Sequence, residues 1–509
     1  MAFGDVIDGA IAPLAPGWAA ERMRARAHIE ASRLALAQVR KYDAADRGRR
    51  TSGWHRDASS ADAESQRSRS MLAWAGHDLV RNNKYAAAGV RQLTATIIGD
   101  GIATQVVHRV KAVQKRAQDE WDRFAEGRVD GFGDWYGHQK ISVREMIAGG
   151  EALTVWHADA EGPNGLVVGR EGAELDMMKD GRDQKAGTRI VQGVEFKDAL
   201  RTGYWFFDEH PHDVMRSQWG PSKRIAAEHV DHLFERLRFG QTRGVSHLAP
   251  LAMTLRDIGD IEDAKRLQEK VQACLAVIIT PGEAQAASPL GHQEALADGR
   301  ASDPLGETIR PGMIARTKPG ESVNVVNPQP SSNTVDFIRQ QIAAVSASMV
   351  PYHLMTGDVS QANYSSLRAA MNGLYSMVDD WQQNEVIPLL LRPALTRRMQ
   401  RLALATGDKR YLEVGVTFAL PQRRLVDPIK DTLGEIMEIR AGLKLLETAL
   451  AERGISGEEH IAKIAAMNTL IDAAGLALDC DPRRVTDSGI LQAAAGYLAP
   501  KTDGGAAAN

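Results

Sequence analysis

Between two strongly periodic apolar segments the chain reads Gly357-Asp358-Val359-Ser360-Gln361-Ala362-Asn363-Tyr364-Ser365-Ser366. Glycine and Asn tolerate left-handed backbone, and Ser and Asn side chains hydrogen-bond to nearby amides. The same residue types are preferred at helix N-caps. The stretch therefore predicts a structured loop that ends at a helix cap.

Apolar residues recur at helical spacing on both sides of this loop. Upstream they are Val335, Ile338, Ile342, Val345 and Met349, and downstream they are Leu367, Met371, Leu374, Val378 and Trp381. Spacings that alternate between three and four residues predict amphipathic helices. The first helix is expected to begin at Asn333 or Thr334 and to be ended by Pro351. Packing against neighbouring copies and packing within one chain would produce the same pattern.

A third helix is predicted over residues 246–272. Its apolar stripe comprises Leu248, Leu251, Leu255, Ile258 and Ile261. Four acids lie mostly off the stripe, namely Asp257, Asp260, Glu262 and Asp263. Paired carboxylates can perform acid–base catalysis, but acids spaced like this on an amphipathic helix usually form its solvated face. We interpret them as that face.

Composition limits the class of protein. The chain has 509 residues, of which 43% are hydrophobic and 25% charged, as in ordinary soluble globular proteins, and its formal net charge is −3. This balance does not indicate a basic nucleic-acid binder. Two cysteines, Cys274 and Cys480, provide no disulfide framework and favour a reducing compartment. No signal peptide is recognisable, and the longest apolar run is shorter than the roughly 20 residues of a spanning helix.

The regions before residue 246 differ in character. The first 70 residues carry Arg and Lys clusters in a polar context, which fits either a solvated terminal segment or an arm that docks on acidic partners or nucleic acid. Residues 71–150 have helical periodicity, whereas β-type runs alternate with Gly-rich turns over residues 150–213. These patterns predict an α+β fold that is mostly helical.

Sequence motifs of enzymes are scarce. The chain contains no phosphate-binding loop of the form GxxxxGK[ST] and no GxSxG nucleophile elbow. The metal-like pairs are His210-Pro211-His212-Asp213 and His229-x-x-His232, and neither has a Cys or Glu companion at zinc-site spacing. We therefore expect no catalytic residues, no metal and no cofactor.

An ordered series of short strings precedes and includes the loop. The chain reads Arg310-Pro311-Gly312-Met313-Ile314, then Lys318-Pro319-Gly320-Glu321-Ser322-Val323, then Val350-Pro351-Tyr352, and finally the loop through Arg368. Earlier, Arg238 to Gly244 has the pattern R-x-G-Q-x-R-G. This order closely resembles the portal proteins of lambda-type tailed bacteriophages, most densely over residues 230–400.

The resemblance implies a portal fold with wing, stem, clip and crown that assembles into a ring with a central channel. Its regions would be 1–70 basic arm, 71–245 wing, 246–279 stem helix, 280–332 clip, 333–352 stem helix, 353–366 tunnel loop, 367–426 long helix and return to the wing, 427–485 helical crown, and 486–509 disordered tail.

The resemblance also implies function. Such a ring, normally a dodecamer, stands at one vertex of the virion capsid, after assembly in the host cytoplasm, and double-stranded DNA passes through it during packaging and ejection. Expected partners are further copies of the chain, the terminase large subunit, the head–tail adaptor and the major capsid protein, with no membrane.

Three sets of residues would carry these roles. The tunnel loop would present Asp358, Val359, Ser360, Gln361, Ala362, Asn363, Tyr364 and Ser365 to DNA; the clip would contact partners through Met313, Lys318, Pro319, Gly320 and Glu321; and Ile338, Ile342, Val345, Leu367, Met371 and Leu374 would pack subunits together.

The loop's composition suits a conduit. DNA carries one charge per about 1.7 Å of its axis, and each neutralised phosphate adds binding that translocation must break. Uncharged polar residues hold DNA more loosely than lysines would, and the single acid, Asp358, is expected to repel phosphate slightly. We interpret the loop as a steric guide.

Two other functions remain open from the residues alone. One is a cytosolic metal-dependent hydrolase that uses His210, His212 and Asp213. The other is a helical scaffold or adaptor that forms no ring, for which the Ala-rich C-terminal helices are the main argument. Neither accounts for the ordered strings from Arg310 to Arg368.

Overall fold

The structure, a computed structural model, describes residues 15–38, 58–157, 166–183, 187–213, 220–274, 333–360, 362–423, 428–451 and 457–476, with short pieces at 13, 49, 52–54, 278–279 and 315–316. The chain divides into a unit of residues 1–59 and a unit of residues 60–509. In the first unit, helix α2 spans Pro16–Gln38. No described helix combines the length and the apolar character needed to cross a membrane.

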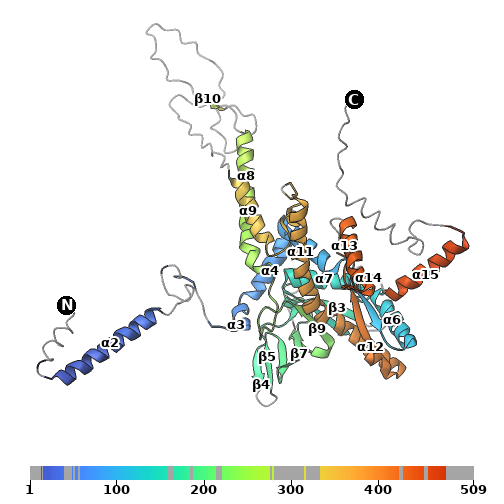
Figure 1. Ribbon diagram of the computed structural model, residues 1–509, viewed down its shortest axis with the longest axis horizontal. Helices are drawn as coiled ribbons and strands as arrows, with labels where there is room; N and C mark the ends of the chain where they lie inside the picture. Colours follow the sequence, from blue (N-terminus) through green and yellow to red (C-terminus); the bar gives the residue numbers. More distant parts are fainter. Residues whose placement is uncertain are drawn as a thin grey trace, which may run out of the picture. The chain divides into compact units, whose positions relative to one another are not determined.

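The second unit begins with helices (Figure 1). They are α3 (Ala61–Ser65), α4 (Arg69–Asn82), α5 (Lys84–Ile98), α6 (Lys111–Ala125) and α7 (Trp135–Ala148). Asn83 caps α5 and Asp134 caps α7, each by accepting backbone N–H bonds through its side chain. Helix α3 and the buried Arg69 belong to this unit.

One strand interrupts the region that periodicity predicts to be helical. Strand β1 (Ala103–Val107) pairs antiparallel with β12 (Gly415–Ala419), so that Ala103 lies opposite Ala419. The partner strand lies about three hundred residues further along the chain, and no local pattern indicates this pairing. Tertiary contact therefore decides the conformation of residues 103–107.

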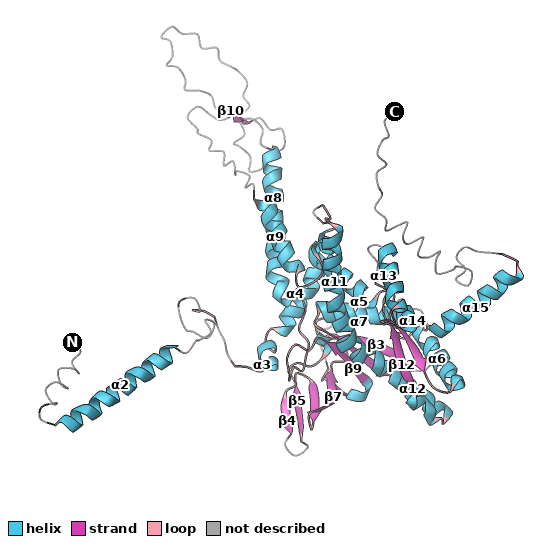
Figure 2. Ribbon diagram, in the orientation of Figure 1, coloured by secondary structure: helices cyan, strands magenta, loops and turns pink. Residues whose placement is uncertain are grey.

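Two antiparallel sheets follow, as the β-type runs predict (Figure 2). The first has the order β3-β2-β9, with β2 at Glu151–His157, β3 at Leu166–Glu171 and β9 at Val230–Phe234. The second comprises β4 (Gly181–Asp183), β5 (Thr188–Val191), β6 (Val194–Lys197), β7 (Leu200–Phe206) and β8 (Lys223–Ala226) in sequential order. Leu153 and Val155 of the first sheet share a hydrophobic cluster with Tyr204 and Phe206 of the second.

The predicted helix over residues 246–272 is present with a shifted start. Residues Ala249–Leu251 form a 3-10 turn, and α8 spans Ala252–Cys274. Leu248, Leu255 and Ile258 are buried in the main core, whereas Ile261 is only half-buried. The acids are not all solvated, because Glu262 binds Lys84 on α5 at 2.6 Å.

The helices around the loop differ from expectation at their ends. Helix α9 spans Thr334–Ser346 and packs beside α8 (Figure 1). It ends before Pro351, which instead stands at the N-cap of the short helix α10 (Tyr352–Thr356). Helix α11 begins at Tyr364, three residues earlier than the first apolar position of its stripe, and runs to Trp381.

Helix α11 continues as the π-helix η6 (Gln382–Leu391) and then as α12 (Arg392–Thr406). Pro388 lies within the π-helical segment and cannot donate the usual backbone hydrogen bond, which accounts for the local change of helix type. The later helices are α13 (Pro428–Arg440), α14 (Leu446–Ala451) and α15 (Gly457–Ala473). Gly442 and Gly475 have positive φ angles after helices α13 and α15.

The main core joins most helices of the second unit. Trp121, Phe124 and Trp135 are fully buried in it, and the rings of Trp121 and Trp135 meet edge to face at 6.4 Å. Several predicted features fall on residues or side chains that the structure does not describe. They are the disordered tail, most of the clip, Cys480 and the side chain of Cys274.

Candidate functional site

The base of the loop is held by one carboxylate. Gly357 adopts a left-handed conformation (φ 76°) as the C-cap of α10, which turns the chain into the loop. Asp358 then accepts hydrogen bonds from the Ser360 backbone N–H at 3.0 Å and from Arg339 on α9 at 2.9 Å. These bonds, those from Ser360 before that from Arg339, lower the pKa of Asp358. The loop is thereby tied to α9.

This pairing corrects the expected role of Asp358. The carboxylate faces a guanidinium, so its charge is largely neutralised within the chain and it does not act as a free repulsive group. Asp358 and Arg339 are each about one-third exposed, at 32% and 36%. The loop therefore carries less uncompensated negative charge than its sequence indicates.

The far end of the loop is a capping box. The Asn363 side chain accepts a hydrogen bond from the Ser366 N–H at 2.8 Å, and the Ser366 hydroxyl bonds back to the Asn363 N–H at 3.0 Å. Tyr364 and Ser365 thus belong to the first turn of α11, and not to the loop as expected. Both are exposed, as are Val359, Ser360, Ala362 and Asn363. Gln361 lies outside the described residues.

The residues predicted to pack subunits together are mostly core residues of the single chain. Ile342, Val345 and Leu374 are at most 4% exposed and belong to the main core, with Ile338 and Met371 packed against it. Leu367 is half-buried. Packing within one chain, the alternative that periodicity left open, therefore accounts for these stripes. The clip residues Met313, Lys318, Pro319, Gly320 and Glu321 lie outside the described residues.

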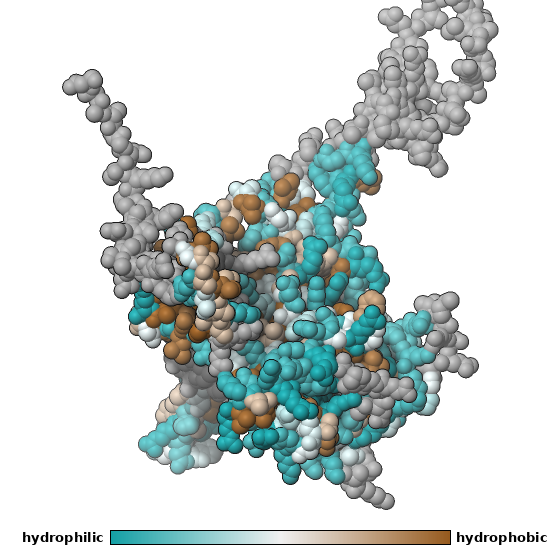
Figure 3. All heavy atoms as spheres, turned by 90° about the vertical axis from the view of Figure 1, so that its right-hand side faces the viewer, coloured by the Kyte–Doolittle hydropathy of each residue, from teal (hydrophilic) through white to brown (hydrophobic). Residues whose placement is uncertain are grey.

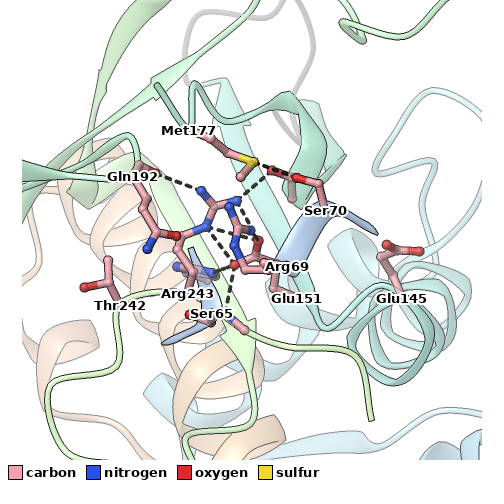
Figure 4. Close-up of polar contacts among 12 residues, drawn as sticks. Ser65, Arg69, Ser70, Glu145, Glu151, Met177, Gln192, Thr242 and Arg243 are labelled. Carbon is pink, nitrogen blue, oxygen red and sulfur yellow. Dashed lines mark hydrogen bonds and ion pairs between the residues drawn. The ribbon is translucent and has the colours of Figure 1, made fainter. Parts of the chain in front are cut away.

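A buried ion-pair network lies at the start of β2 (Figure 4). Glu151 is 2% exposed and accepts hydrogen bonds from Arg243 at 2.6 Å, from Arg69 at 2.5 Å and from His232 at 2.9 Å. Arg243 also donates to the backbone carbonyls of Gln192 and Gly172. Glu151 thus connects α4, the first sheet and the segment that leads to α8, and Arg243 extends the network to the turn between β5 and β6 of the second sheet.

Electrostatics keep this network ionised. Burial opposes the charge on Glu151, but the guanidiniums of Arg243 and Arg69 outweigh burial and hold the pKa of Glu151 well below its usual range. Burial lowers the pKa of Arg69 to about 10, so this residue stays cationic at neutral pH. Burial also lowers the pKa of His232 to about 4, so its ring is neutral there.

The R-x-G-Q-x-R-G pattern is explained by this network. Arg243 is its central cation, and the Gly244 N–H donates to Glu151 at 3.0 Å. A Cβ at Gly244 would lie 2.0 Å from the Gly150 carbonyl oxygen, so only glycine fits. Gln241 closes the preceding turn by bonding the Leu237 N–H and the Arg243 carbonyl.

Two buried histidines make the fold sensitive to acid. Burial lowers the pKa of His138 and that of His232 to about 4, against 6.5 for a free imidazole. The unfolded chain therefore binds protons at a pH where the folded chain does not, and stability falls as pH drops from 6.5 towards 4. The loss amounts to at most about 3 kcal/mol for each ring.

We expect His138→Asn to flatten this pH dependence, since Asn removes the titrating ring next to the Thr154 hydroxyl. Urea unfolding of the unaltered chain and of His138→Asn, each at pH 7 and pH 5, measures the effect. His229→Asn is the control, because His229 is 46% exposed. An equal pH dependence in all three proteins would contradict the assignment.

The histidines of each metal-like pair lie in different surroundings. His229 is exposed near Glu228, whereas His232 is buried against Glu151. His212 packs its ring edge to face on Trp74 at 5.0 Å. His210 instead lies 3.5 Å from Glu171. The described ligand group nearest to metal geometry comprises His77, Glu145 and Glu171, which no sequence spacing indicated.

The family model and two similar curated proteins agree on one protein family. Residues 47–382 match the model for phage portal proteins of the lambda family. The portal protein of Escherichia phage N15 is 24% identical over 490 residues, covering 83% of this chain and 88% of that protein. Portal protein B of Escherichia phage lambda is 22% identical over 483 residues, covering 82% and 86%. The family match alone spans more than half of the 509 residues.

Solved structures also resemble the chain. A chain from the neck of a native GTA particle, computed with C12 symmetry, has a TM-score of 0.39 at 15% identity and covers 76% of this chain and 92% of its own length. A chain from the virion of a native gene transfer agent particle has a TM-score of 0.36 at 16% identity, with coverages of 80% and 97%.

Proposed function

The chain belongs to the lambda family of phage portal proteins, and on this premise we propose that its copies close into a ring that conducts double-stranded DNA. The observation that carries the proposal is the family match over residues 47–382. A portal protein is the head–tail connector of the particle, and we propose that this one works as a structural conduit without catalysis.

Exposed apolar surface supports assembly with other copies. Large hydrophobic side chains remain exposed over residues 428–476, among them Ile429, Met437, Leu443, Leu445, Leu446, Ile461, Ile464, Met467, Leu470 and Leu476. On the face in Figure 3, hydrophobic residues lie in groups among hydrophilic ones. Such surface usually marks an interface, and a ring needs a heterologous interface whose rotation closes.

The stem helices also leave apolar residues uncovered. On α9, Val335 is 71% and Phe337 47% exposed, and on α8, Met253 is 67% and Leu267 62% exposed. These side chains are better candidates for subunit contacts than the buried stripes of the same helices. We propose that neighbouring subunits cover them in the ring.

The loop is the proposed contact with DNA. It contains no Lys or Arg from Gly357 to Ser366, and its described residues beyond Asp358 are exposed. A loop anchored by Asp358 and by the Asn363 cap can touch a moving duplex without binding phosphates tightly. We further propose the terminase large subunit, the head–tail adaptor and the major capsid protein as partners, at the capsid vertex of the virion.

Ring formation tests the proposal. We expect light scattering of the purified chain to give particles near twelve times its 55.4 kDa mass, and negative-stain images to show rings with a central channel. Coexpression with the capsid protein of the same particle provides the nucleating partner. A chain that stays monomeric or dimeric in both preparations would contradict the ring.

A further inference from the structure

A surface cavity of about 810 Å³ lies where α4, α7, β3 and the segment after β7 meet. Its lining includes three histidines, His77, His210 and His212, and, besides Glu151, the two further carboxylates Glu145 and Glu171. In Figure 4, Glu145 stands apart from the network around Glu151, and it bonds to His77 instead. This group therefore calls for an explanation of its own.

The distances within the group suit a metal ion. One ligand atom each from His77, Glu145 and Glu171 lies within 4.8 Å of the others. His77 Nε2 is 2.9 Å from Glu145 Oε1, and His210 Nε2 is 3.5 Å from Glu171 Oε2. Imidazole nitrogen and carboxylate oxygen are both zinc ligands, at about 2.0–2.2 Å from the ion in a tetrahedron. Ligand atoms around one ion are separated by distances of this order.

The charges in the cavity leave room for a cation. His77 Nε2 lies 2.9 and 3.0 Å from the two carboxylate oxygens of Glu145, and the Glu171 carboxylate lies beside this pair. One imidazole therefore faces two carboxylates, whose charges a divalent ion would neutralise.

Several arginines lie in or near the cavity, and two of them pair with carboxylates outside the proposed ligand group. Arg69 donates to Glu151 and not to this group. Arg81 and Arg144 line the cavity with exposed side chains. Arg170 pairs with Glu174 at 2.5 Å.

We propose that His77, Glu145 and Glu171 bind one Zn²⁺ ion and that His210, 3.5 Å from Glu171, supplies the fourth ligand of a structural site. The ion would join two helices to the edge of the three-stranded sheet and to the segment that follows β7. Structural zinc sites have four protein ligands and stabilise the fold they connect. The site would therefore hold the sheets against the helical body, independently of ring formation.

Zinc binding by the full chain tests this proposal. After EDTA treatment and dialysis, we expect titration calorimetry with ZnCl₂ and elemental analysis to show one ion per chain, and the midpoint of thermal unfolding to rise. Glu145→Gln/Glu171→Gln should weaken binding at least tenfold, since even residues that only support metal ligands change affinity by about 10–100-fold. MgCl₂ should have little effect, because magnesium prefers six oxygen ligands.

A matched pair of surface residues is the control. Glu228 and His229 lie 3.6 Å apart at exposed positions of the same unit, so Glu228→Gln/His229→Asn should leave zinc binding unchanged. If the double variant fails to fold, Glu171→Gln alone serves as the test, because Glu171 is 47% exposed. Equal zinc binding by the unaltered chain and Glu171→Gln, or no binding by either, would overturn the proposal.

Discussion

Replacing Glu151 with Gln is expected to lower the free energy of unfolding by about 3–5 kcal/mol, because it leaves buried guanidiniums without a counter-charge. Gln keeps the volume of the side chain, so the loss reports charge and hydrogen bonding and not a cavity. Arg243 is 0% and Arg69 4% exposed. Both sheets and α4 would lose their common anchor.

Urea unfolding followed by circular dichroism measures this loss. Asp263→Asn is the matched control, since Asp263 also pairs with an arginine, at 2.8 Å, but is 72% exposed. Exposed pairs contribute about 0–1 kcal/mol, so the control should unfold almost as the unaltered chain does. Similar stabilities for the two variants would contradict the role given to Glu151.

Lysine in the loop is expected to slow DNA packaging strongly. Ala362 is exposed between the Asp358 anchor and the Asn363 cap, and Ala362→Lys adds a cation there in every subunit of the proposed ring. Each phosphate contact adds about 0.9 to the slope of log affinity against log salt. With about three lysines engaged at once, tripling the salt concentration should weaken DNA retention by about twentyfold.

Packaging by capsids assembled with each variant measures this effect. Ala362→Gln is the control for size, because Gln adds length without charge. We expect the lysine variant to assemble normally, to package slowly at low salt and to recover as salt rises, while the Gln variant packages normally. A lysine variant that packages at the unaltered rate at every salt concentration would show that loop charge is irrelevant to translocation.

Local patterns predicted much of the fold. The helices around the loop, the stripe from Leu248 to Ile258 and the β-type runs are all present, since each depends on spacing over a few turns or strand residues. Helix ends were less predictable. Pro351 stands at the start of α10 although it was expected to stop α9, and α11 begins at Tyr364 because Asn363 and Ser366 cap each other.

In the candidate site, too, local sequence predicts some features and only the fold reveals others. Asp358 reads as a free acid in sequence, but Arg339, nineteen residues away on another helix, pairs with it. The stripe of Ile342 and Val345 could face a partner or a core, and only the packed chain shows that it faces the core. Periodicity reports that a face is apolar, not what covers it.

The sequence by itself determined the family, the helical seams and the loop with its glycine turn and Asn cap, because these are set by residues close together in the chain. Only the tertiary structure decided the β1–β12 pairing, the network around Glu151 and the grouping of His77 with Glu145 and Glu171. Those residues lie tens to hundreds of positions apart. The interactions that unite them, backbone hydrogen bonds between the two strands and buried pairs of charged or hydrogen-bonding side chains, exist only once the chain has folded.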